Sequence, residues 1–148
     1  MEDQAILVSE QVLQVPFVYS AGPAASRFLV ALRDEKRIYG IRCAACAKVF
    51  VPPRGRCPLC QAKLDDWVEV GPVGTLTNFT VVHYQETVHP AVAPFAIGVI
   101  QLDGADTGLV HLVRTPAGTE LQIGMRVQAV WSGQRRGHIL DLEAFEPV

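Results

Sequence analysis

Short apolar runs separated by turn-forming residues fill the chain from Trp67 onward. In the fourth of these runs, Val127, Ala129 and Trp131 recur at every second position, which is the period of a strand with one buried face. Glycine, proline and aspartate gather between the runs, where they favour turns. Five such runs in about eighty residues predict a small, closed β-barrel. They cover residues 73–84, 95–103, 107–115, 125–133 and 138–148.

A helical pattern precedes the barrel, over residues 23–37. Phe28, Leu29 and Leu32 fall on one face at helical spacing, and Pro23 suits the first turn of a helix.

The residues before this helix show no strong period. The stretch VPFVYSAG is apolar and aromatic, with Phe17 and Tyr19 at its centre. We expect an arm that docks on a partner, and the alternative is an arm that packs back on its own barrel.

The four cysteines stand between residues 41 and 64 as two Cys-x-x-Cys pairs, Cys43 with Cys46 and Cys57 with Cys60. Each pair directs two sulfurs to one point, and the ten intervening residues suffice for a hairpin that brings the pairs together. Four converging thiolates leave a tetrahedral metal no open position, so we expect a structural zinc ion in a rubredoxin-like ribbon. The flanking stretches IYGIRC and KVFVPP predict two short strands.

Ligand spacing alone does not name the metal, since a rubredoxin-like iron site has the same spacing. Two disulfides are a further alternative, which a reducing compartment disfavours. A thioredoxin-like redox pair would need a βαβ context that this pattern lacks.

Charge is spread unevenly, although the net charge is only −2. Residues 27–63 hold nine Lys/Arg and two Asp/Glu, a balance of +7, whereas residues 64–148 hold four basic and ten acidic residues, a balance of −6. A basic half favours an anionic partner such as a phosphate-bearing cofactor or nucleic acid, and a solvated face is the alternative.

The N-terminus carries acids where a secretory signal would carry bases, and no apolar run approaches the length of a membrane span. We therefore expect a soluble, cytoplasmic protein.

The remaining chemistry does not compose an active site. No cysteine is left over as a nucleophile, and there is no phosphate-binding glycine loop or serine elbow. His83 and His111 lie within strand patterns, and His138 follows a turn. His89 lies in the long loop between the first two strands, where it could reach a ligand. Asp65 and Asp66 are expected to start the barrel, and Asp103 and Asp106 to flank a turn.

Together these patterns predict a mainly β protein. We expect an N-terminal arm and helix over residues 1–40, a zinc ribbon over 41–64, and a five-stranded oligonucleotide/oligosaccharide-binding (OB) barrel over 65–148.

Three stretches in this order resemble the acyl-CoA-associated zinc-ribbon/OB-fold family. They are FVYSAGPAASRFLVALRDEKRIYGIRC, then CAAC and CPLC with VPPRGRCP between them, then GTLTNFTVVHY with PFAIGVIQLDG. The resemblance runs from about Phe17 to Phe145.

The resemblance implies a non-catalytic subunit that accompanies a thiolase-like enzyme and helps to shape its CoA-substrate site. The partner would supply the catalytic residues, in the thiolytic cleavage of an aromatic 3-oxoacyl-CoA such as benzoylsuccinyl-CoA in anaerobic toluene degradation. Arg42, Arg54 and Arg56 are candidates to meet the CoA phosphates. Phe17, Tyr19, His89 and Phe95 are candidates to meet the partner or its substrate.

Two other functions remain open at this point. A single-stranded nucleic-acid-binding module would use the basic ribbon, but the acidic barrel opposes it. An independent metal-dependent hydrolase would need an open metal position, which four cysteine ligands deny.

Overall fold

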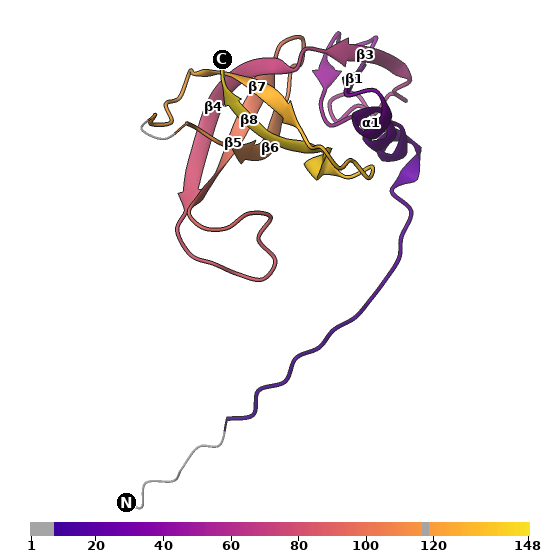
Figure 1. Cartoon of the computed structure of the whole chain (residues 1–148). Helices are drawn as coiled ribbons and strands as arrows, with labels where there is room; N and C mark the ends of the chain where they lie inside the picture. Colours follow the sequence, from indigo (N-terminus) through magenta and orange to yellow (C-terminus); the bar gives the residue numbers. More distant parts are fainter. Residues whose placement is uncertain (1–7, 117–118) are drawn as a thin grey trace, which may run out of the picture.

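The computed structural model of the chain describes residues 8–116 and 119–148. Over these residues the protein is mainly β, with an N-terminal α-helix, a three-stranded sheet that carries the cysteines, and a closed five-stranded barrel (Figure 1). This confirms the predicted fold class. The expected acids at the extreme N-terminus lie outside the described residues, as does part of the loop before the fourth barrel strand.

The helix α1 spans Gly22–Asp34, with a proline in its first turn as predicted. Its buried face consists of Phe28, Ala31 and Leu32. The sequence pattern placed the end of the helix about three residues too late. Lys36 adopts a left-handed conformation with φ of 54°, which turns the chain away from the helix axis and into the first strand.

The three-stranded sheet has the order β2-β1-β3, with β1 at Ile38–Arg42, β2 at Val49–Phe50 and β3 at Asp66–Val70. The strands β1 and β2 are the two short strands predicted beside the first cysteine pair. The strand β3 runs antiparallel to the whole of β1, from Asp66 opposite Arg42 to Val70 opposite Ile38. Asp66, expected at the start of the barrel, therefore belongs to the ribbon sheet. The division of the chain at residue 65 stays a prediction.

The barrel has the strand order β4-β5-β6-β8-β7. Its strands are β4 at Val73–Val82, β5 at Phe95–Leu102, β6 at Gly108–Val113, β7 at Arg126–Trp131 and β8 at Leu142–Pro147. Each lies inside one of the five predicted runs. The parallel contact between β6 and β8 is confined to one residue pair, Val113 with Phe145. The short 3-10 helix η1, Ile139–Asp141, lies directly before β8.

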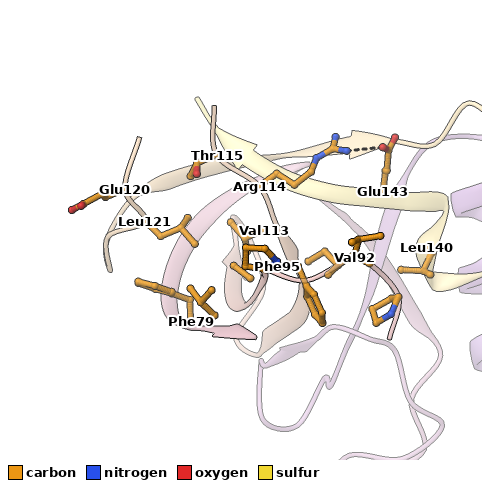
Figure 2. Close-up of a pocket in the computed structure, with 16 residues that line it drawn as sticks. Phe79, Val92, Phe95, Val113, Arg114, Thr115, Glu120, Leu121, Leu140 and Glu143 are labelled. Atoms are coloured by element: carbon orange, nitrogen blue, oxygen red, sulfur yellow. Dashed lines mark hydrogen bonds and ion pairs between the residues drawn. The ribbon is translucent and has the colours of Figure 1, made fainter. Parts of the chain in front are cut away.

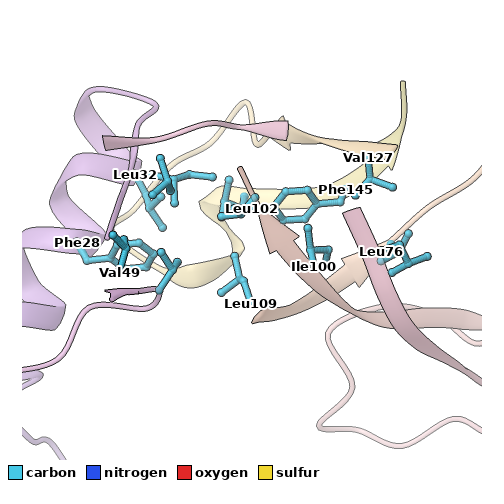
Figure 3. Close-up of a cluster of buried hydrophobic side chains, with 14 residues drawn as sticks. Phe28, Leu32, Val49, Leu76, Ile100, Leu102, Leu109, Val127 and Phe145 are labelled. Atoms are coloured by element: carbon cyan, nitrogen blue, oxygen red, sulfur yellow. The ribbon is translucent and has the colours of Figure 1, made fainter. Parts of the chain in front are cut away.

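One continuous apolar core joins the helix, the ribbon sheet and the barrel (Figure 3). Phe28 and Leu32 enter it from α1, Val49 from β2, and Ile100 and Phe145 from the barrel. Its buried members are Phe28, Leu32, Ile38, Val49, Val51, Val70, Leu76, Ile100, Leu102, Leu109, Val113, Val127, Leu142 and Phe145. Because the parts share buried side chains, the ribbon is held in one orientation relative to the barrel.

Hydrogen bonds from the β5–β6 turn fasten the ribbon to the barrel. The Asp106 carboxylate accepts bonds from the Lys48 ammonium at 2.8 Å and the Val49 N–H at 2.9 Å. The Thr107 hydroxyl accepts from the Val51 N–H at 2.8 Å and donates to the Val51 carbonyl at 2.9 Å. The turn that the sequence explained by local chemistry thus also joins the ribbon sheet to the barrel.

Thr107→Val should destabilise the whole chain, since it leaves the N–H and carbonyl of the buried Val51 without these partners at unchanged side-chain volume. We expect a loss of about 1–3 kcal/mol in the free energy of unfolding, measured by urea denaturation. Thr80→Val, at an exposed position of β4, is the matched control and should change little. Equal effects of the two substitutions would contradict a specific role for the Thr107 hydroxyl.

Candidate metal centre and partner-facing surfaces

Two equivalent backbone turns carry the four cysteines. The Cys43 N–H donates to the Lys48 carbonyl at 2.8 Å, and the Cys57 N–H donates to the Ala62 carbonyl at 2.9 Å. Each turn thus closes from its first cysteine to the residue five positions later. We call the turn around Cys43 the first knuckle and the turn around Cys57 the second knuckle.

Each knuckle contains a left-handed residue directly after its second cysteine. Ala47 has φ of 53° and Gln61 has φ of 63°. A left-handed conformation costs a non-glycine residue roughly 1–2 kcal/mol, so tertiary contacts must hold both turns in place. The recurrence at equivalent positions indicates that the turn geometry needs this conformation.

The four sulfurs converge as a tetrahedral metal site requires. The Sγ atoms of Cys43 and Cys60 are 3.6 Å apart, those of Cys46 and Cys57 are 3.9 Å apart, and all four lie within 4.8 Å of one another. A zinc ion with bonds of about 2.3 Å to four sulfurs would set them about 3.8 Å apart. The cysteines are free thiols, so the disulfide alternative is not realised. The donor set therefore fits structural zinc.

The pKa values of the thiols show why these side chains favour a cation. Hydrogen bonding with the Cys60 sulfur and burial raise the pKa of Cys46 to about 12. Burial also opposes ionisation of Cys57, but N–H groups of Cys60 and Leu59 outweigh it and lower the pKa of Cys57 to about 7. Ionisation of one thiol therefore makes ionisation of the neighbouring thiols less favourable. A bound divalent cation would offset this repulsion between thiolates.

A small second core surrounds the sulfurs. It contains Ile41, Phe50 and Leu64, with Trp67 packed against them. This cluster is separate from the main core, and three of its seven members are the cysteines Cys43, Cys46 and Cys57. The ribbon tip therefore depends on its metal more than on apolar burial.

The three arginines predicted to meet phosphates make different contacts within the ribbon. Arg42 lies 3.8 Å from the Asp66 carboxylate, opposite it across β1 and β3. The Arg54 guanidinium lies over the Phe50 ring, 5.6 Å from its centroid. Arg56 donates to the Gln61 carbonyl at 3.0 Å. Only Arg42, of these three, is paired with a described carboxylate.

The N-terminal arm extends away from the folded body (Figure 1). Phe17 and Tyr19 are 75% and 78% exposed, and their rings stack with centroids 5.8 Å apart. Val8, Val12, Leu13, Val15 and Val18 are also exposed. Over its described residues, the arm does not pack on the barrel.

The β4–β5 loop is ordered by its own side chains. The His89 ring packs edge-on against Tyr84 and Phe95, with centroids 5.2 Å apart in both cases. Nδ1 of His89 accepts from the Glu86 N–H at 3.2 Å, so a neutral ring carries its proton on Nε2. The side chain of Gln85 accepts from the Ala93 N–H at 2.8 Å. His89 and Phe95 are thus brought together, as part of a preorganised loop.

Sequence reasoning missed a groove of about 810 Å³ between this loop and the barrel (Figure 2). Its apolar wall includes Phe79, Phe95 and Leu121, and the ion pair between Arg114 and Glu143 spans part of its rim. The lining comes from β4, the β4–β5 loop, β5, β6, the loop before β7, η1 and β8. No single stretch of sequence carries a signal for it, because the residues meet only when the barrel closes.

His111 and His138 have structural surroundings, whereas His83 is exposed. His111 is buried, and its Nε2 lies 3.2 Å from the Ile139 carbonyl, while its Nδ1 has no hydrogen-bond partner among the described residues. Nδ1 of His138 accepts from the Leu140 N–H and so caps η1. Within residues 8–116 and 119–148, the four cysteines form the one group of potential ligands gathered closely enough to hold a metal.

Two family models match the chain. Residues 31–65 match the ChsH2 rubredoxin-like zinc ribbon domain, and residues 67–132 match the ChsH2 C-terminal OB-fold domain. The matched segments hold all four cysteines and most of the barrel. Among the described residues, no helix is long and apolar enough to cross a membrane.

Two curated relatives are similar to this chain. A DUF35 domain-containing scaffold protein from Methanocaldococcus jannaschii is 27% identical over 101 residues, which cover 68% of this chain and 71% of the relative. A probable enoyl-CoA hydratase alpha subunit from Thermomonospora curvata is 30% identical over 127 residues. That match covers 83% of this chain but only 39% of the hydratase subunit.

Solved structures share the architecture. The Ltp2-ChsH2(DUF35) aldolase contains a chain that superposes with a TM-score of 0.65 at 26% identity, covering 88% of this chain and 98% of that one. A DUF35 family protein of unknown function from Sulfolobus solfataricus superposes with a TM-score of 0.60 at 22% identity, and supports the fold.

Cys57→Ser should abolish stoichiometric zinc binding and unfold the knuckles before the barrel, since the ribbon core is built around the metal. Metal content by mass spectrometry and hydrogen exchange over residues 41–64 measure the two effects. Ala44→Ser, an exposed non-ligand position in the first knuckle, is the control and should retain one equivalent. One equivalent of zinc in the Cys57 variant would refute four-cysteine ligation.

Acid should destabilise the fold through His111. Burial lowers its pKa below the ordinary value of 6.5, and the bond to the Ile139 carbonyl offsets this only in part. Below about pH 6.5 the histidine is protonated in the unfolded chain but stays neutral in the folded chain. The contribution of His111 to the free energy of unfolding is therefore fully present above this pH and decreases below it. The melting temperature should therefore drop between pH 7.5 and 5.5. His111→Gln should flatten this slope, whereas His83→Gln should not. A wild-type slope in the His111 variant would contradict the assignment.

Proposed function

We propose that this chain, which carries the zinc ribbon and the OB-fold domain of the ChsH2 family, is a non-catalytic subunit of an acyl-CoA enzyme complex. The observation that carries the proposal is the metal centre. Four sulfurs surround the one clustered ligand site of the described residues, so a bound zinc ion organises the chain and offers no position for substrate. The catalytic residues then belong to a partner.

The names of the relatives point to the same kind of complex. One structural relative belongs to an aldolase assembly, and one curated relative is named as a subunit of a probable enoyl-CoA hydratase. Neither name favours the nucleic-acid alternative. We infer that a catalytic protein acting on a CoA thioester binds this chain, and that the complex works in the cytoplasm.

At finer detail, we propose a thiolase-type partner. Its reaction would be the thiolytic cleavage of an aromatic 3-oxoacyl-CoA such as benzoylsuccinyl-CoA, a step of anaerobic toluene degradation. The resemblance of the ribbon and the first two barrel strands to accessory subunits of such thiolases supports this proposal. The contacts of Arg42, Arg54 and Arg56 with the CoA phosphates, which the sequence predicts, stay a prediction.

Two apolar elements fit a role in assembly. The arm exposes Phe17 and Tyr19, which would bury their stacked rings on the partner. The β4–β5 loop presents His89 and Phe95 from an internally braced turn, so it would lose little freedom on entering a neighbour's substrate site.

Reconstitution tests the function. The chain is co-expressed with the thiolase-type protein that co-purifies with it, and thiolytic activity is measured for the catalytic protein with and without this chain. We expect activity to require both. Full activity of the catalytic protein alone would overturn the proposal.

Phe17→Ser/Tyr19→Ser should weaken the complex about ten-fold or more, because both rings lose their apolar contact with the partner. Zinc content and the unfolding midpoint should not change, since these side chains are exposed on the isolated chain. Gln11→Ser/Gln14→Ser, at polar arm positions, is the matched control. Unchanged affinity in the aromatic double variant would show that the arm does not dock.

A further inference from the structure

Seven of the nine cations in residues 27–63 fall into two groups, and Arg27 and Lys36 belong to neither. Four of the nine Lys/Arg in residues 27–63 lie within 4.0 Å of a described carboxylate. The pairs are Arg33 with Asp34, Arg37 with Glu69, Arg42 with Asp66, and Lys48 with Asp106. These charges are therefore offset within the protein itself.

The second knuckle holds a different group. Arg54, Arg56 and Lys63 are exposed, and none lies within salt-bridge distance of a carboxylate among the described residues. Arg56 and Lys63 are paired across an isolated antiparallel bridge, so their side chains start from neighbouring backbone positions. No aspartate or glutamate occurs between residues 43 and 64.

Neutral groups hold two of these side chains in place. The Arg54 guanidinium rests on the Phe50 ring, and Arg56 is anchored on the Gln61 carbonyl at 3.0 Å. Such contacts restrict the side chains without offsetting their charge. Less freedom is then lost when an anion binds.

The backbone below these side chains is equally restrained. The Leu64 N–H donates to the Gly55 carbonyl at 3.0 Å, which closes the base of the knuckle. Leu59, at the tip, is 67% exposed. The second knuckle thus presents one apolar side chain and three cations on a braced turn, a mixture typical of protein interfaces.

The shape of this surface favours a macromolecule over a small anion. None of the four side chains lines the groove or the smaller pocket near His138. A small ligand needs a concave site that buries most of its surface. An extended nucleic acid would also meet the acidic barrel half, whereas a protein can match the knuckle alone.

We propose that the second-knuckle surface, formed by Arg54, Arg56, Leu59 and Lys63, docks on an acidic patch of the catalytic partner. This inference rests on the proposed function. It adds to that function the part of this chain that contacts the partner, and it specifies that the partner's contact surface is negatively charged. A zinc ion with four thiolates would carry −2, which the three cations more than offset.

A pair of charge-matched double variants tests the inference in the full complex. Arg54→Glu/Arg56→Glu reverses two knuckle cations, and Lys36→Glu/Arg136→Glu reverses two exposed cations elsewhere. Dissociation constants for the co-purifying partner are measured at several salt concentrations. We expect the knuckle variant to bind at least about ten-fold more weakly at low salt and to lose most of the salt dependence, with a smaller effect in the control.

Zinc content is measured for each variant. If Arg54→Glu/Arg56→Glu loses its zinc, the neutral double variant Arg54→Gln/Arg56→Gln is used instead. This neutral variant should still bind the partner more weakly than the wild-type chain. Wild-type affinity in the zinc-loaded knuckle variant, or equal weakening in both double variants, would overturn the docking site and leave the proposed function intact. Failure of the wild-type chain to bind any acyl-CoA enzyme would remove both.

Discussion

The shared apolar core is the constraint on which the rest of the structure depends. Phe28 and Leu32 of the helix, Val49 of the ribbon and Phe145 of the barrel are buried against a common set of neighbours. Independent domains would expose these side chains to water at a large cost in free energy. The ribbon tip and the barrel groove are therefore presented at fixed relative positions, as the proposed role of a subunit requires.

A bound metal would stabilise the ribbon tip, which the main apolar core does not include. Around the four sulfurs, burial is limited to a small cluster that includes Ile41, Phe50 and Leu64. Ionisation of one thiol discourages ionisation of the others, as the opposite pKa shifts of Cys46 and Cys57 show. A divalent cation resolves that conflict and fixes both knuckles. A bound metal would hold the shape of the ribbon tip, which is not part of the main apolar core.

Three surfaces then remain for contact with another protein. The arm is apolar and extended, the β4–β5 loop is apolar and internally braced, and the second knuckle is cationic. They differ in chemistry, so a partner that met all three would be recognised specifically. None of these surfaces is needed to build the main core of the chain. Their exposed apolar or charged side chains therefore indicate a role in binding.

The sequence by itself determined the helix, the five barrel strands and the four metal ligands, because local periodicity and cysteine spacing encode them directly. It did not determine that β3 returns to the ribbon sheet, that Asp106 fastens the ribbon to the barrel, or that Arg42 is paired with Asp66 while Arg54 and Arg56 are not. These contacts join residues distant along the chain, so no local pattern records them. The groove arises in the same way, since its walls meet only after the barrel has closed.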